Sequence, residues 1–115
     1  MKDRSRITVY IKTSHNGYRD DLIAAGKRFN TVIEQDSTYR ARAAGELLNT
    51  YNENWNEGAP STEAEFVSRM SIDFIMFPKE GVLEVNYDDD GMFLGHRITA
   101  YLDSELNFDW AGING

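Results

Sequence analysis

An apolar or aromatic side chain recurs at every fourth position between residues 39 and 55 of this chain. The positions are Tyr39, Ala43, Leu47, Tyr51 and Trp55. Residues four apart lie on one face of an α-helix, so the pattern predicts a long helix with one face that has to be buried. Any fold of this chain must therefore supply an apolar surface against which that helix can pack.

Two further helices are predicted on either side of this one. The first spans residues 20–34, where apolar side chains again have helical spacing at Leu22, Ala25, Phe29, Val32 and Ile33. The second is a short helix over residues 63–70, because Thr62 and Glu65 have the spacing of a capping box.

Stretches rich in β-branched and aromatic residues predict the strands. They cover residues 6–12, 72–77, 82–87, 97–102 and 106–110, and a glycine-ended tail follows the last of them. Helices that come together, with most strands after them, are typical of an α+β fold. We expect an N-terminal strand, two longer helices and one short helix packed on an antiparallel sheet of about four strands. Where the N-terminal strand joins that sheet stays open.

The chain length and the distribution of charge limit the classes of function that fit this sequence. The chain has 115 residues, which predicts a single domain over 1–115. Residues 1–45 carry nine basic and five acidic side chains, whereas residues 46–115 carry three basic and fourteen acidic ones, for a net charge of -7. This asymmetry favours a basic protein partner and disfavours direct binding to nucleic acid, whose phosphate backbone needs clustered positive charge.

The absence of cysteine excludes disulfides, thiolate metal sites and cysteine nucleophiles. No apolar run has the length of a signal peptide or of a membrane span, so we expect a cytoplasmic protein that does not bind membranes.

The densest group of chemically active residues lies between residues 86 and 96, and Asp88, Asp89 and Asp90 are consecutive within it. Oxygen ligands suit calcium and magnesium, so Asp88 and Asp90 are the metal-ligand candidates. A helix–loop–helix calcium site does not fit, because the position that needs a glutamate is occupied by Arg97. His96 together with Asp88 or Asp90 could instead act as acid, base or ligand.

The same segment also has a purely structural reading, which the residues favour over a metal or acid–base site. The aspartates would then form a solvated turn, and Gly91 and Gly95 would supply positive φ angles. Phe93 would anchor the loop on the core, and His96 would be a half-buried side chain that pins the hairpin.

A second group lies at the end of the long helix. Trp55 closes the apolar stripe, which favours a place in the core, and Asn52 is placed to bond backbone groups at the helix end. The alternative is that Trp55 lines a groove with Phe93 and His96.

These two groups together resemble a known family, a bacterial domain of unknown function numbered 2262. The resemblance covers residues 40–115 and rests on the motifs Asn-Glu-x-Trp and Asp-Gly-x-x-Phe-x-Gly-His. The matching residues are Asn52, Glu53 and Trp55, and then Asp90, Gly91, Phe93, Gly95 and His96. The resemblance implies that these positions form a site, but it brings no activity, and an aromatic typical of the family is replaced here by Leu94.

The sequence therefore favours a non-catalytic, acidic protein-binding module, such as an immunity or inhibitor protein that neutralises a basic toxin or a defence protein. No cofactor is expected. The expected contact residues are acidic: Glu57, Glu63, Glu65, Asp88, Asp89 and Asp90. The alternative is a metal-dependent enzyme or metal-binding domain centred on residues 88–96. Homo-oligomerisation through the edge of the N-terminal strand is a further alternative.

Overall fold

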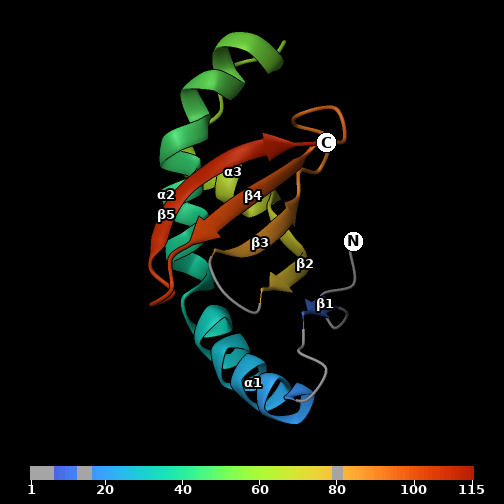
Figure 1. The fold of residues 1–115 in the computed structure, drawn as a ribbon. Coiled ribbons are helices and arrows are strands. Elements are labelled where there is room, and N and C mark those ends of the chain that lie inside the picture. Colours follow the sequence, from blue (N-terminus) through green and yellow to red (C-terminus); the bar gives the residue numbers. More distant parts are fainter. Residues whose placement is uncertain (1–6, 13–16, 79–81) are drawn as a thin grey trace.

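The structure is a computed structural model that describes residues 7–12, 17–78 and 82–115. It has the α+β fold that the sequence predicts (Figure 1). The helices are α1 (Tyr18–Glu34), α2 (Asp36–Thr50) and α3 (Glu63–Arg69), and a π-helical turn (Tyr51–Trp55) continues α2. The strands are β1 (Thr8–Ile11), β2 (Ser71–Phe77), β3 (Leu83–Asp88), β4 (Arg97–Leu102) and β5 (Phe108–Asn114).

The sheet has five strands in the order β1-β2-β3-β4-β5, where we expected about four. Strands β2 to β5 form the antiparallel sheet of the prediction, and β1 joins its edge by parallel pairing, with Thr8 opposite Phe74 and Ile11 opposite Phe77. The last strand begins and ends later than predicted, because the glycine-ended tail pairs with β4 up to Asn114 opposite Arg97.

Helices α2 and α3 cover one face of the sheet and form a hydrophobic core with it. In Figure 1, α2 runs behind β4 and β5, and α3 packs beside α2. Tyr39, Ala43, Leu47 and Tyr51 of the predicted stripe are buried, and Trp55 is partly buried. Leu83, Val85 and Tyr87 of β3 face them and are 0% exposed. Helix α1 extends away from the sheet, so the molecule is elongated, at 53 × 27 × 24 Å.

A polar network fixes the start of α2 to the sheet. The Tyr87 hydroxyl donates to Asp36 Oδ1 at 2.6 Å, and Arg40 pairs with Asp36 Oδ2 at 2.7 Å. Arg40 also donates to the Met70 carbonyl at 2.7 Å. Burial, with Asp36 beside the ring, raises the pKa of Tyr87 well above its ordinary value. The phenol therefore stays protonated and keeps donating to Asp36.

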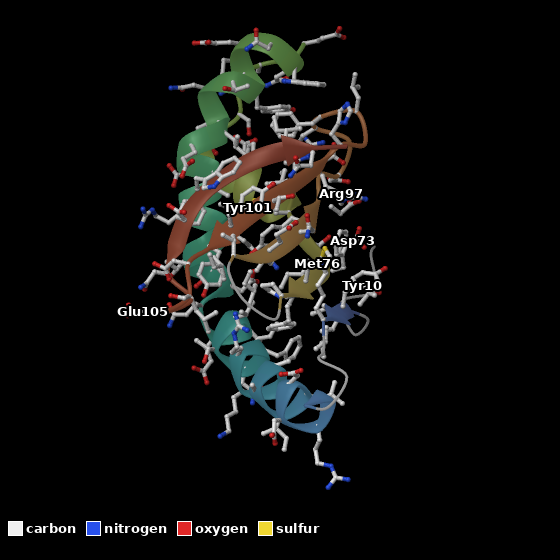
Figure 2. The ribbon with its side chains drawn as sticks, in the orientation of Figure 1. Tyr10, Asp73, Met76, Arg97, Tyr101 and Glu105 are labelled. Atoms are coloured by element: carbon white, nitrogen blue, oxygen red, sulfur yellow. The ribbon has the colours of Figure 1, made fainter. Side chains whose placement is uncertain are left out.

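The opposite face of the sheet carries polar and aromatic side chains, and it is turned to the reader in Figure 2, where Tyr101 and Arg97 are labelled. The Tyr101 and Trp110 rings are stacked, with centroids 4.1 Å apart. Thr99 donates to Asn86 at 2.6 Å, and both are buried beneath this layer. Among the described residues no helix is long and apolar enough to cross a membrane.

Candidate functional site

The π-helical turn places Trp55 at the end of the long helix. Its closing bond runs from the Asn56 nitrogen to the Tyr51 carbonyl at 2.8 Å, five residues back. A π-helical turn inserts one residue beyond the α-helical repeat, and such turns are frequent at functional sites. Tyr51 and Trp55, at the two ends of the turn, both contact Phe93.

Asn52 holds this turn to the chain that leads into α3. Its Oδ1 accepts from the Ser61 nitrogen at 2.9 Å and from Asn56 Nδ2 at 3.0 Å, and its Nδ2 donates to the Ser61 carbonyl at 3.1 Å. These bonds are all within the chain, and two of them join the Asn52 amide to the backbone of Ser61, as predicted for this residue. Asn52 therefore positions the site and does not present a free group to a ligand.

Phe93 anchors the 89–96 loop to the helices. It is 0% exposed, and its ring centroid lies 5.5 Å from that of Tyr51, 5.4 Å from that of Trp55 and 6.1 Å from that of Phe66. Edge-to-face pairs at these distances are favourable. The expectation that Phe93 folds the loop onto the core is thus confirmed.

His96 is exposed, where the structural reading expected it to be half-buried. Its ring lies edge-on to Trp55 with 5.9 Å between the centroids. The backbone of Gly115 lies so close to this imidazole that a Cβ there would collide with it. Trp55, Phe93 and His96 are therefore neighbours, as the groove alternative expected, but only Trp55 and His96 reach the surface.

The three consecutive aspartates have three different roles. Asp89 is 4% exposed, and its carboxylate accepts from the backbone nitrogens of Gly91 at 3.2 Å, Phe93 at 2.8 Å and Gly95 at 3.0 Å. Its prediction as a contact residue is wrong, because a buried carboxylate occupied by the loop's own amides presents nothing to a partner. Asp89 instead organises the loop.

Asp88 and Asp90, the candidate metal ligands, bond within the chain. Asp88 Oδ2 accepts the Asp90 nitrogen at 3.1 Å, and Asp90 Oδ2 pairs with Arg69 Nε at 3.2 Å. Arg69 also donates to the Asp90 carbonyl at 2.7 Å and to the Tyr51 hydroxyl at 3.2 Å. Within the described ranges, no group of three or more His, Asp or Glu is placed to hold a metal ion.

The remaining predicted contact residues are the three glutamates, Glu57, Glu63 and Glu65. Glu57 and Glu63 are exposed, and Glu63 begins α3. Glu65 is exposed as well, but its carboxylate completes the predicted capping box, accepting from the Thr62 nitrogen at 3.1 Å. Glu53, in the π-helical turn, adds an exposed carboxylate that was not among the predicted contact residues.

A cleft of about 310 Å³ lies between the π-helical turn and the 89–96 loop. Both segments lie at the end of the molecule away from α1 (Figure 1). The cleft is lined by Tyr51, Asn54, Trp55, Asn56, Glu57, Gly91, Met92 and Leu94.

Leu94 is the most exposed large apolar residue of the described chain, at 80%, and its φ is 57°. A bulky residue in the left-handed region costs of order 1–3 kcal/mol, and such strain clusters at functional sites. The sequence offered one signal for it: a leucine directly before a glycine in a loop with two glycines. The groove alternative expected Trp55 to line a cleft here, but Phe93 and His96, which it also named, are not among the described residues that line it.

Comparison with known proteins identifies the family but no activity. The chain belongs to the family described as "Uncharacterized protein conserved in bacteria (DUF2262)", which matches residues 2–113. The match includes the N-terminal strand and α1, which lie outside the 40–115 range of the motifs. No curated protein and no solved structure matches the chain.

Proposed function

We propose that this protein is a non-catalytic, acidic protein-binding module that binds a basic protein, such as a toxin or a defence protein that it neutralises. The binding surface would be the end of the molecule formed by the π-helical turn, the segment into α3, and the 89–96 loop. We call this surface the acidic end and define it by Glu53, Glu57, Glu63, Asp90 and Leu94.

One observation carries the proposal: the strained, exposed Leu94 and the carboxylate of Glu57 line the same cleft. Leu94 is 80% exposed, Glu57 lines the cleft, and Glu53 and Glu63 are exposed nearby in sequence. Protein interfaces combine an apolar centre with a polar rim, and complementary charge steers partners of opposite sign.

The acidic end is also held rigid. The Asn52–Ser61 bonds join the π-helical turn to the chain before α3, and the Arg69–Asp90 pair joins α3 to the loop. A pre-organised surface loses less conformational entropy when it binds.

Affinity capture from a cell lysate, with the whole chain immobilised, tests the proposal. The Glu57→Lys/Glu63→Lys variant changes two exposed carboxylates of the acidic end. The matched control is Asp20→Lys/Glu34→Lys, which makes the same charge change on α1; Asp20 and Glu63 both lie in the first turn of a helix.

At low salt, the wild type and the α1 control should retain one basic protein, and the acidic-end variant should lose it. Raising the salt should release it from the wild type, because exposed charges are screened. Retention of no protein at low salt, or equal retention by both double variants, would contradict the proposal.

A further inference from the structure

We propose that the cleft at the acidic end binds an arginine side chain of the partner; this inference rests on the proposed function. An arginine needs a flat aromatic surface, an acceptor for its N–H groups and an apolar track for its stem. The cleft brings all three together.

One wall provides the aromatic surface and the acceptor. Trp55 and Glu57 both line the cleft. Tryptophan is the best aromatic partner for a cation, and a carboxylate accepts a guanidinium through two parallel hydrogen bonds. The exposed Asn54 side chain on the same wall can add an amide oxygen as an acceptor, whereas the Asn56 oxygen accepts from the Gly58 nitrogen at 2.9 Å.

The opposite wall suits the aliphatic stem of an arginine. Leu94 gives this wall its exposed apolar surface, and Gly91 and the 2% exposed Met92 complete the lining. A bound side chain that runs along this wall would cover Leu94, which is otherwise 80% exposed. An occupant with an apolar stem and a cationic head therefore accounts for the exposed leucine and the carboxylate together.

The charged residues around the cleft favour the binding of a cation. The described residues that line the cleft include no Lys or Arg. Arg69 donates to the hydroxyl of the lining residue Tyr51 at 3.2 Å, but its charge is offset by Asp90 at 3.2 Å. Glu57 is exposed and lines the cleft on the wall that carries Trp55. Glu53, in the same π-helical turn as Trp55, is exposed as well.

Elsewhere in this protein, arginine side chains lie over aromatic rings. The Arg42 and Arg97 guanidinium carbons each lie 5.1 Å from a phenylalanine ring centroid, over Phe108 and Phe74. The ring contacts of Trp55, by contrast, are with Phe93 and His96.

Fluorescence titration with capped hexapeptides tests the inference. Trp110→Phe removes the other tryptophan and keeps a ring that can stack on Tyr101, so emission then reports Trp55 alone. Isothermal titration of the wild-type chain measures the same affinities without a substitution. The probes are hexaarginine, hexalysine and hexacitrulline, the last an uncharged analogue of arginine.

Hexaarginine should change Trp55 emission saturably and bind at least threefold more tightly than hexalysine, with hexacitrulline weaker still. Glu57→Gln should weaken hexaarginine roughly tenfold, because it removes the charged acceptor. The matched Glu34→Gln variant changes an exposed carboxylate on α1, outside the acidic end, and should leave this affinity unchanged.

Equal affinity for hexaarginine and hexalysine, or binding that neither changes Trp55 emission nor responds to Glu57→Gln, would overturn the arginine inference. The proposed function would then still stand on the capture experiment. If capture retains no basic protein and hexaarginine does not bind either, both proposals fail.

Discussion

Replacing Asp89 tests whether one buried carboxylate organises the 89–96 loop. Asp89→Ala removes the acceptor of three backbone N–H groups, of which the Phe93 amide is buried and the Gly91 and Gly95 amides are partly exposed. A hydrogen bond to a charged group contributes about 1.5–3 kcal/mol, and a buried donor without an acceptor costs about 1–3 kcal/mol. Water can replace the bonds to the partly exposed Gly91 and Gly95 amides but not the bond to the buried Phe93 amide. We therefore expect the free energy of unfolding to fall by about 3 kcal/mol.

Asp89→Asn refines the expected magnitude. Its single oxygen can turn toward the Phe93 and Gly95 amides, which keeps two of the three bonds and leaves the amide nitrogen facing Gly91. The loss should therefore be about half that of Asp89→Ala, or about 1.5 kcal/mol.

Urea and thermal unfolding, followed by circular dichroism, measure both effects. A loss of about 3 kcal/mol lowers the melting temperature of a domain of this size by roughly 12 °C. Asp88→Ala and Asp90→Ala are the matched controls, and each should cost less than about 1 kcal/mol, because their bonds are exposed. If Asp89→Ala is no more destabilising than Asp88→Ala, the reasoning about the loop is wrong.

Three further substitutions test the sheet and the site. Tyr87→Phe should cost about 1.5–3 kcal/mol in urea unfolding by removing the bond to Asp36. Because the pKa of Tyr87 is raised in the folded state, it stabilises the fold below about pH 10. Above about pH 10, the free energy of unfolding should fall by up to about 1.4 kcal/mol per pH unit as Tyr87 titrates. The Tyr87→Phe variant should lack this part of the pH dependence. Gly112→Ala should shift tryptophan emission, because its Cβ would stand 2.9 Å from the Trp110 ring and force it to move; unchanged emission would contradict that contact. His96→Ala should cost only about 0.5–1 kcal/mol in the same unfolding assay, because the ring is exposed and contacts Trp55 edge-on.

Periodicity predicted most of the fold because it reports which face of an element is buried. The stripe from Tyr39 to Tyr51 and the alternation of Leu83, Val85 and Tyr87 both correspond to buried faces of the structure. The pairing of β1 with β2 could not be predicted in this way, because β1 and β2 are separated by all the helices and a local pattern does not name a distant partner. The end of β5 was missed because Gly112 is typical of a tail, whereas here it makes room for the Trp110 ring.

The site was only partly predictable for a related reason. Three consecutive carboxylates indicate charge, but not which one turns inward. The alternation of β3 would have shown it, because Asp89 continues the inward series of Val85 and Tyr87. A π-helical turn has no comparable signal: apolar residues four apart are compatible with α-helix and with one inserted residue, and tertiary packing decides between them.

Carboxyl-labelling mass spectrometry of the captured complex tests the central claim most directly, since it reports which carboxylates a partner covers. The account predicts that Glu57 and Glu63 are labelled in the free protein and protected in the complex, while Asp20 and Glu34 on α1 are labelled equally in both. Protection confined to α1, or no change at Glu57 and Glu63, would contradict a binding surface at the acidic end.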